Sequence, residues 1–272
     1  MATEPPDDRS LPRRAREGTR QAVRTAGFLG VTAVIVPPFA LHMKRTSRTG
    51  QARVEARDAW VRAWAKAQMR LFGVEMRVEG SLPPPTRQGE RGRLLVANHR
   101  SAADIGVILA TFGGTMVSRS DLAGWPVLGP GAVAADTIFV DRELPQSGAV
   151  TLRAMQRRLS EGNTVCIFPE GTTADGDEVR PFHRGGFVAA LGAKAEVLPV
   201  GLAYPASAKA AFTEAKFRDH LGRIARGPGF PVALAIGAPL PAEPGERAGS
   251  FAERAREAVQ ACVERARARV GP

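Results

Sequence analysis

Short apolar runs that alternate with helical stretches constrain the fold of this chain more than any other feature. The runs have the length of strands, and the stretches between them space apolar side chains every three or four residues. We therefore predict an α/β domain with a mixed, largely parallel sheet that helices cover on both faces. The predicted strands are residues 94–97, 115–118, 137–141, 164–168, 196–204 and 231–236, and the predicted helices are residues 104–112, 147–159, 186–194 and 250–269.

The segment before this domain has the composition of a membrane-associated segment. Residues 1–24 are polar and rich in Arg and Pro, and we expect a basic, disordered leader there. Residues 25–43 carry no formal charge and barely reach the length that spans a bilayer. Pro37 and Pro38 are expected to break a helix in this run, and basic residues flank both of its ends. We therefore expect a segment that dips into the bilayer and returns.

Residues 51–72 place apolar side chains at helical spacing among Arg and Lys, with Trp60 one turn before Trp64. This pattern favours a helix at a membrane interface, although a helix packed on the soluble domain has the same spacing. The chain is thus divided into a leader (1–24), a helical membrane-associated segment (25–74) and an α/β domain (75–272). The first two parts predict an N-terminal helical membrane anchor.

The charge of the chain indicates the chemistry of its partners. Lys and Arg outnumber Asp and Glu by 38 to 27, which gives a net charge of +11 and favours an anionic partner. The sequence lacks zinc-finger spacing, an aromatic-rich binding strand and a base-reading helix, so a lipid headgroup surface or a charged substrate is favoured over nucleic acid. Cys166 and Cys262 lie in apolar and helical patterns, which predicts buried thiols in a reducing compartment.

The first polar cluster follows the run 94–97 and contains His99, Ser101 and Asp104. His99 precedes Asp104 across a strand-to-helix turn, so the carboxylate can hold one ring nitrogen while the other faces a substrate. That is the arrangement of a general base and its orienting acid. The spacing Ser101-x-x-Asp104 is also a capping box, in which both residues only serve the helix N-terminus. The capping alternative leaves His99 unexplained.

Two arginines follow later strands, at the sheet edge where open α/β sheets bind ligands. Arg142 is either a member of a surface ion pair or a bidentate clamp for phosphate or carboxylate. Arg184 comes before Gly185 at a predicted helix N-terminus, where backbone amides favour anions. Both arginines are candidates for binding an anionic group such as a phosphate or a carboxylate.

A third cluster is the turn Glu170-Gly171-Thr172-Thr173. It offers a carboxylate, two hydroxyls and the close backbone approach that glycine permits, so it can form an anion-binding turn. The alternative is a glycine turn with threonines that cap a helix. The sequence contains no Gly-x-Ser-x-Gly elbow, no phosphate loop ending in Lys-Ser or Lys-Thr, and no His spacing typical of metal ligands. Serine hydrolases, common nucleotide-binding enzymes and zinc enzymes are therefore disfavoured.

Taken together, the clusters resemble in order and spacing the four motifs of the glycerolipid acyltransferases, and most closely the bacterial 1-acylglycerol-3-phosphate acyltransferases. The resemblance covers residues 75–240. The matching stretches are His99-x4-Asp104, Ile138-Phe139-Val140-Asp141-Arg142, Phe168-Pro169-Glu170-Gly171-Thr172 and Leu198-Pro199-Val200.

The resemblance implies an enzyme that moves a fatty acyl group from a thioester to the free hydroxyl of a lysolipid, without an acyl-enzyme. His99 acts as general base, Asp104 orients it, and Arg142 with the Glu170-Gly171-Thr172 turn holds the acceptor's headgroup. The donor is acyl-CoA or acyl carrier protein, no cofactor or metal is bound, and the implied acceptor is 1-acylglycerol-3-phosphate. A chain of this kind is expected on the cytoplasmic face of the inner membrane, next to anionic lipids.

Departures from the family pattern bear on the acceptor. Ala102 and Ala103 replace bulkier residues, Asp136 stands where Gly is usual, Thr173 replaces Arg, and His183 occupies a position that is often Lys. The loss of two cationic candidates and the gain of an acid weaken the case for a phosphomonoester acceptor, and the Thr-Thr variant resembles the relatives that acylate lyso-ornithine lipid. Lyso-ornithine lipid or another lysophospholipid is therefore the alternative acceptor. A catalytically inactive lipid-binding protein and a thioester hydrolase are the rival functions.

Overall fold

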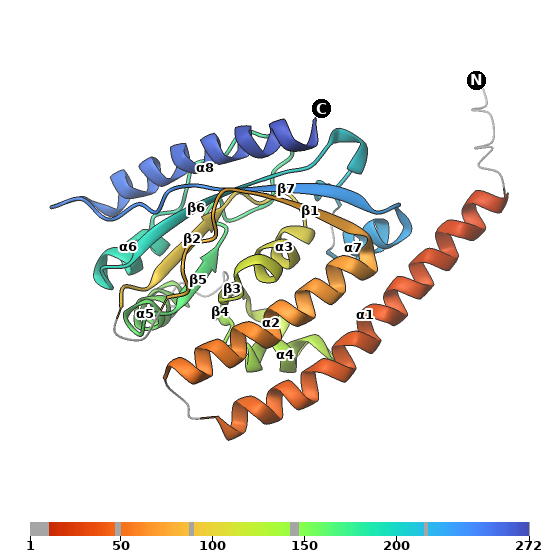
Figure 1. The fold of residues 1–272 in the computed structure, drawn as a ribbon, viewed down its shortest axis with the longest axis horizontal. Helices are drawn as coiled ribbons and strands as arrows, with labels where there is room; N and C mark the ends of the chain where they lie inside the picture. The colour runs from red at the N-terminus through yellow and green to blue at the C-terminus, as the bar shows by residue number, and fades with distance from the viewer. Residues whose placement is uncertain (1–10, 47–49, 87–89, 142–146, 215–216, 272) are drawn as a thin grey trace.

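A seven-stranded, mostly parallel sheet forms the centre of the computed structural model, which describes residues 11–46, 50–86, 90–141, 147–214 and 217–271 (Figure 1). The strand order is β1-β7-β6-β2-β5-β3-β4, and the neighbours β6 and β7 are antiparallel while the other neighbours are parallel. The strands are β1 (Val74–Glu79), β2 (Arg93–Ala97), β3 (Thr115–Arg119), β4 (Ile138–Val140), β5 (Thr164–Ile167), β6 (Glu196–Ala203) and β7 (Phe230–Ile236).

Helices cover both faces of this sheet. Helices α5, α6 and α8 pack on one face, and α3, α7 and α2 pack on the other, with α1 outside α2 (Figure 1). The α-helices are α1 (Leu11–Arg45), α2 (Gln51–Phe72), α3 (Ala103–Phe112), α4 (Leu128–Ala134), α5 (Ser147–Ser160), α6 (Gly185–Gly192), α7 (Phe217–Arg226) and α8 (Ala248–Val270), and two short 3-10 helices are η1 (Ser120–Gly124) and η2 (Ala206–Ala208). The predicted fold class is confirmed.

Alternation along the central strands builds the two halves of the core. On β2, Leu95 and Ala97 face the α3 side, whereas Leu94 and Val96 face the side of α5, α6 and α8. All of β2 is buried because side chains alternate across a strand and both faces of the sheet are covered. Polar side chains of the candidate site therefore have to lie at the ends of the strands.

Helix α1 differs from the prediction for the N-terminal part of the chain. Residues 11–24, which were assigned to a disordered leader, are helical, and residues 1–10 lie outside the described part. The helix also continues through Pro37 and Pro38 to Arg45, so the predicted break is wrong. Proline removes one backbone donor at each position, but its fixed φ suits a helix. Packing of α1 against α2, α4 and α7 compensates for the hydrogen bonds that are lost.

Helix α2 has the predicted bounds, but it lies between α1 and α3 rather than at an open surface. Its tryptophans face α1: Trp60 stacks on Phe39 with 6.0 Å between ring centroids, and the indole nitrogen of Trp64 donates to Thr32 Oγ1 at 3.0 Å. The alternative of a helix packed on the domain thus describes α2 better than an interfacial helix does.

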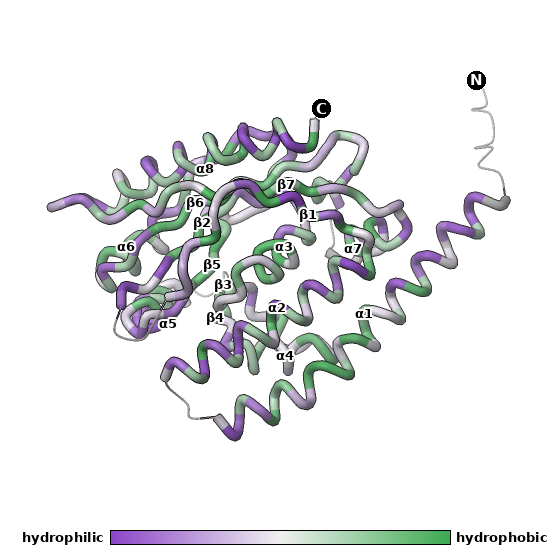
Figure 2. The backbone as a smooth tube through the Cα atoms, viewed as in Figure 1, coloured by the Kyte–Doolittle hydropathy of each residue, from purple (hydrophilic) through white to green (hydrophobic). Residues whose placement is uncertain are grey.

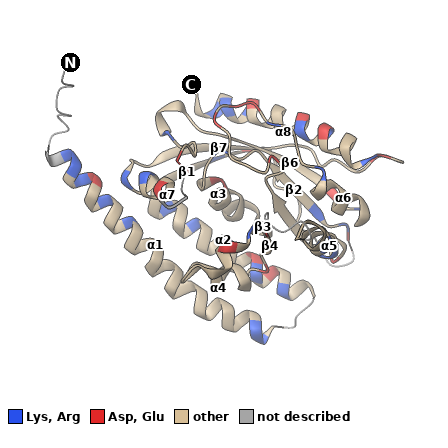
Figure 3. Cartoon of the chain, turned by 180° about the vertical axis from the view of Figure 1, so that it is seen from behind, with Lys and Arg blue, Asp and Glu red and all other residues tan. Residues whose placement is uncertain are grey.

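Helix α1 is the described element with the composition of a membrane segment. Its middle is largely hydrophobic in Figure 2, and its Lys and Arg residues lie towards both ends in Figure 3. Within the described residues, Arg13–Arg45 is the one helix that is long and apolar enough to cross a bilayer, a criterion that a signal sequence near an N-terminus also meets. It exposes large apolar side chains along its length: Val23, Leu29, Val34 and Leu41.

Asp136 fastens α2 to the sheet. It adopts a positive φ of 57°, where glycine is usual, and its carboxylate lies 3.1 Å from Arg53 of α2 and 3.2 Å from Arg158 of α5. Arg57, also on α2, is buried with its Nη1 at 3.9 Å from the same carboxylate. Asp136 is therefore a partner of three arginines rather than a negative charge that faces an acceptor, which corrects its interpretation from the sequence.

We expect Asp136→Asn to lower the free energy of unfolding by about 2 kcal/mol, because it removes the carboxylate that Arg53, Arg57 and Arg158 share at a largely buried site. Asparagine tolerates the left-handed conformation, so the backbone is not perturbed by the change. Asp121→Asn is the matched control, since Asp121 pairs with Arg119 at 3.0 Å but is 53% exposed. Urea unfolding should show a change of about 0.5 kcal/mol or less for the control. Equal effects of the two substitutions would contradict this role of Asp136.

Candidate active site

Three adjacent parallel strands end at the candidate active site. β2 lies between β6 and β5, and all three run in the same direction. Beyond their carboxyl ends come Asn98 and His99 after β2, Glu170 after β5, and Tyr204 after β6. This is the sheet edge at which open α/β sheets bind ligands. The topology thus gathers side chains that are far apart in sequence.

His99 and Asp104 form the predicted pair. His99 Nδ1 lies 2.8 Å from Asp104 Oδ2, and the imidazole stacks on Phe168 with 4.1 Å between ring centroids. The His99 side chain is 19% exposed, whereas that of Asp104 is fully buried. Because Nδ1 faces the carboxylate, Nε2 is the ring nitrogen that can meet a substrate. The geometry is that of an oriented general base.

Asp104 also organises the turn that precedes α3. Its Oδ2 accepts hydrogen bonds from the backbone N–H groups of Arg100 at 2.6 Å and Ser101 at 2.8 Å. The Ser101 hydroxyl accepts from the N–H of Ala103 at 3.2 Å. The contacts expected of a capping residue and those expected of an orienting acid therefore occur together, since one carboxylate caps the helix and holds His99. Because the same carboxylate makes both sets of contacts, the helix cap also determines the orientation of the His99 imidazole.

Glu170 braces the backbone of His99. Its Oε1 accepts from the His99 N–H at 2.7 Å, and its Oε2 accepts from the Arg180 N–H at 3.1 Å. The His99 carbonyl in turn accepts from the N–H of Ala174 at 2.9 Å, so the turn after β5 holds His99 on both sides. Glu170 is 6% exposed, and burial raises the pKa of its carboxyl group. Its contacts differ from the headgroup contact predicted from the sequence.

The other predicted binding residues surround this turn. Gly171 has a positive φ of 72°, and a Cβ there would approach the His183 ring to 2.7 Å, so glycine is required. Thr172 and Arg184 are exposed, and Thr173 is half-buried. Arg184 comes directly before α6. Arg142 lies outside the described residues.

Several residues of the site were not assigned from the sequence. The Asn98 amide bonds the N–H and carbonyl of Leu202, at 2.8 and 3.0 Å, and joins β6 to the turn. Tyr204 donates its hydroxyl hydrogen to Asp104 Oδ1. His220 of α7 is buried and accepts from the Ala102 N–H through Nε2 at 3.2 Å. The position of Tyr204 at the carboxyl end of a predicted strand was the one signal that could have indicated its role.

His220 supports the far side of the turn. Because its Nε2 accepts from a backbone N–H, Nδ1 carries the proton and donates to Glu214 at 3.0 Å. Burial lowers the pKa of His220, so the ring is neutral at pH 7. Helix α7 covers the sheet beside α3.

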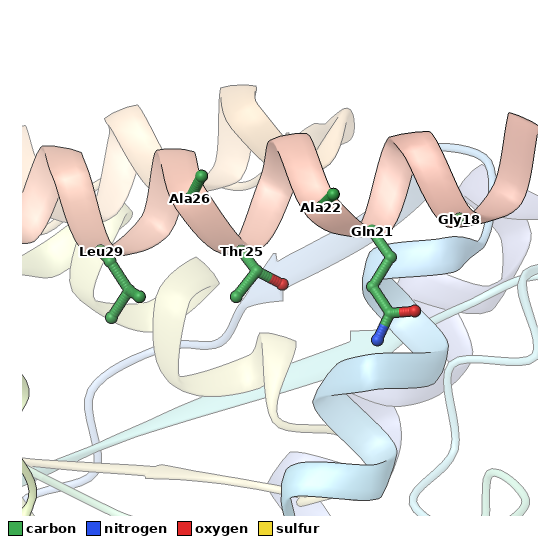
Figure 4. Close-up of a pocket in the computed structure, with 6 residues that line it drawn as sticks. All are labelled: Gly18, Gln21, Ala22, Thr25, Ala26 and Leu29. Atoms are coloured by element: carbon green, nitrogen blue, oxygen red, sulfur yellow. The ribbon is translucent and has the colours of Figure 1, made fainter.

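Other groups that the sequence raised lie away from this chemistry. Cys166 and Cys262 are free and buried, as predicted, and burial raises the pKa of the Cys166 thiol to about 12. No group of three His, Cys, Asp or Glu side chains suited to a metal ion occurs in the described residues. A groove is lined entirely by α1, and it contains no predicted site residue (Figure 4). Its lining consists of Gly18, Gln21, Ala22, Thr25, Ala26 and Leu29.

Comparison with known proteins identifies the family. A model of the family described as Acyltransferase matches residues 75–203, which contain all four motifs. The lyso-ornithine lipid O-acyltransferase of Pseudomonas aeruginosa is 32% identical over 247 residues, which cover 89% of this chain and 92% of that protein. The chain belongs to the acyltransferase family.

Other members of the acyltransferase family act on a different acceptor. The 1-acyl-sn-glycerol-3-phosphate acyltransferase of Neisseria gonorrhoeae is 32% identical over 134 residues, covering 49% of this chain and 52% of that protein. The crystal structure of the 1-acyl-sn-glycerophosphate acyltransferase PlsC from Thermotoga maritima has the same fold. Its TM-score is 0.70 at 23% identity, over 94% of this chain and 100% of that one. The resemblance inferred from the motifs is confirmed, and the acceptor differs among relatives.

Proposed function

We propose that this acyltransferase moves a fatty acyl group from a thioester, acyl-CoA or acyl carrier protein, to the free hydroxyl of a lysolipid, with His99 as general base. The observation that carries the proposal is the His99–Asp104 pair at 2.8 Å, with His99 Nε2 directed away from the carboxylate. A thioester is already activated, so the reaction needs a base and correct orientation rather than a nucleophilic side chain. Both thiols of the chain are buried and unsuited to covalent catalysis.

In the proposed transfer, this geometry supplies the base and its counter-charge. His99 Nε2 accepts the proton of the lysolipid hydroxyl as that oxygen bonds to the thioester carbonyl carbon. Asp104 stabilises the imidazolium that forms, because its Oδ2 faces Nδ1. When the tetrahedral intermediate collapses, the carbon–sulfur bond breaks and His99 returns the proton to the departing thiolate. The products are an acylated lipid and a free thiol, and His99 is neutral again.

The acceptor's headgroup is the finer part of the proposal. Lyso-ornithine lipid is supported by the relative that matches along nearly the whole chain and by Thr173 at a position where arginine would suit a phosphomonoester. Its headgroup carries an ammonium and a carboxylate, which need less positive charge than a phosphate dianion does. 1-Acylglycerol-3-phosphate remains the second candidate, supported by the Neisseria relative. Arg142 and Arg184 are proposed to hold the acidic group in either case.

The lipid surface is proposed to bind α1. The exposed apolar side chains of α1, with basic residues towards its ends, suit insertion into an anionic leaflet on the cytoplasmic face of the inner membrane. Because α2 packs between α1 and α3, a bound α1 would hold the catalytic domain at that surface. The substrate and the product would then stay in the leaflet.

We expect Val34→Asp to weaken binding to vesicles that contain anionic lipid about tenfold or more, because Val34 is 73% exposed on α1 and would be buried among lipid chains. Val150→Asp is the matched control, since Val150 is 60% exposed on α5. Vesicle co-sedimentation measures both. Equal binding of Val34→Asp and the control would place the membrane contact elsewhere.

The test of the function is acyl transfer by purified full-length protein in detergent. Long-chain acyl-CoA and acyl carrier protein thioesters are offered with lyso-ornithine lipid, 1-acylglycerol-3-phosphate and other lysophospholipids. Transfer to at least one acceptor is expected, and the preferred acceptor names the substrate. Fatty acid release without a lysolipid would favour a hydrolase. Vesicle binding without transfer to any acceptor would favour a lipid-binding protein.

A further inference from the structure

Tyr204 lies directly behind the candidate active site and has no role in the reaction as described above. It is the only tyrosine in the chain, and it follows the last residue of β6. Leu198, Val200 and Leu202 occupy the alternate positions of β6 that face α3. Tyr204 continues this alternation and therefore points towards the first turn of α3, where Asp104 lies. Its hydroxyl donates to Asp104 Oδ1.

The surroundings give Tyr204 a single position. The Asn98 side chain fixes β6 two residues earlier through both backbone groups of Leu202. The Tyr204 carbonyl accepts from Arg267 Nη1 at 2.6 Å, and the phenol ring packs against Phe230 with 5.9 Å between centroids. The side chain is 3% exposed. The Tyr204 hydroxyl therefore cannot leave Asp104 and bond to water instead unless β6 moves.

The two oxygens of Asp104 are held by different donors. Oδ2 is surrounded by the N–H groups of Arg100 and Ser101 and by His99 Nδ1. Oδ1 receives its hydrogen bond from Tyr204. Asp104 has no exposed surface, and among the described residues Tyr204 is the side chain that donates to Oδ1, so the phenol stabilises the charge on that oxygen.

We propose that Tyr204 is a positioning residue that keeps Asp104 ionised and oriented, and that it thereby sets the pH at which the His99–Asp104 pair becomes an active base. The inference rests on the proposed function. A hydrogen bond to an ionised group favours the ionised form. The phenol therefore favours the deprotonated pair, which carries a full negative charge, over the protonated pair, which is neutral. Burial and the charge of Asp104 raise the pKa of Tyr204, so it remains a donor throughout an assay near neutral pH.

The first test is Tyr204→Phe, which removes the hydroxyl and keeps the ring. We expect kcat to fall about tenfold with little change in KM for donor or acceptor, because no substrate contact is lost. The acid limb of the pH profile of kcat/KM is expected to move up by about one pH unit. Thr164→Val is the matched control: Thr164 is a buried residue at the opposite end of β5, with its hydroxyl 3.4 Å from that of Thr86. The acid limb of the pH profile of Thr164→Val should coincide with that of the wild type.

The second test uses the fact that the chain has one tyrosine. Growth on 3-fluorotyrosine replaces Tyr204 alone in untagged protein and preserves the hydroxyl. The fluorinated phenol is more acidic and donates a stronger hydrogen bond, so the acid limb is expected to move to lower pH, opposite to its movement in Tyr204→Phe. The fluorotyrosine protein also tests the role of Tyr204 if the Tyr204→Phe variant does not fold.

The outcomes separate the inference from the function on which it rests. Opposite movements of the acid limb in the two Tyr204 proteins, with none in Thr164→Val, support the inference. An unmoved acid limb in the fluorotyrosine protein, with normal transfer by the wild type, overturns the inference and leaves the proposed function standing. An equal shift of the acid limb in Thr164→Val also overturns the inference, because the shift would then reflect a general loss of packing in the sheet. Absence of transfer by the wild type overturns the proposed function itself.

Discussion

His99→Ala is expected to lower kcat for acyl transfer about 10³-fold and to leave folding and vesicle binding intact. The imidazole is the proton acceptor in the proposed reaction, and general base catalysis contributes about 10²–10⁴-fold. His99 is partly exposed and its ring contacts Phe168 on one face, so its removal leaves no large cavity in the core. Initial rates with a long-chain acyl-CoA and the preferred lysolipid measure the effect.

Asp104→Asn is the companion variant, because it preserves the shape of the carboxylate. The amide retains one oxygen as an acceptor but brings an N–H₂ group among the four donors that surround Asp104. We expect a similar loss of kcat, since His99 would lose its orientation and its counter-charge. Thermal unfolding of both variants provides the control for folding. Turnover within fivefold of wild type in either variant would refute the assignment of the pair.

Glu170→Ala is expected to lower kcat by about 10²-fold although Glu170 does not touch the ring of His99. The substitution removes the acceptor from the N–H groups of His99 and Arg180, and the His99 backbone can then shift. A displacement of a catalytic group by about 1 Å is enough for a loss of that size. The KM for the acceptor separates this role from headgroup binding: a brace changes kcat, whereas a headgroup contact changes KM. A rise in the KM for the acceptor with unchanged kcat would show instead that Glu170 contacts the acceptor's headgroup.

Glu170→Gln tests the same residue through the pH dependence of stability. Burial raises the pKa of Glu170 above its ordinary value of 4.5, so folding favours the protonated carboxyl group. The wild type should therefore lose free energy of unfolding, relative to the glutamine variant, as the pH rises from below 4.5 through the folded-state pKa. Denaturant unfolding of both proteins at pH 4 and pH 8 measures the difference. A difference that does not change with pH would contradict the raised pKa.

The buried strands and the helices α2, α5 and α8 could be predicted from the sequence because their patterns are local. The six predicted strands correspond to β2 to β7, and residues 51–72 correspond to α2 with the same bounds. β1 was missed because it lies at the sheet edge and has a buried side chain only at Val74. α4 was missed because it is short and contains two glycines and a proline, which are typical of loops.

The residues of the site were predicted where one motif contains both partners, and not where the partners come from different strands. His99 and Asp104 lie in one turn, so their spacing fixed the pair. Tyr204 and Glu170 contact that turn from β6 and β5, and this depends on the order of the strands in the sheet. The spacing of residues within one motif does not indicate the order of the strands in the sheet. The same reason explains why Asp136 was taken as a free charge, although arginines of α2 and α5 surround it.

The pairing of β1 with β7 has a consequence for how the molecule assembles during synthesis. Among the described strands, β1 is the first to leave the ribosome, and its neighbour β7 is the last. Contacts between such distant segments form late and slowly. α1 and α2 precede all of the described strands, so both helices can form while β1 still lacks its partner. Premature termination before residue 230 would leave β1 and β6 with unpaired edges and make the truncated chain prone to aggregate.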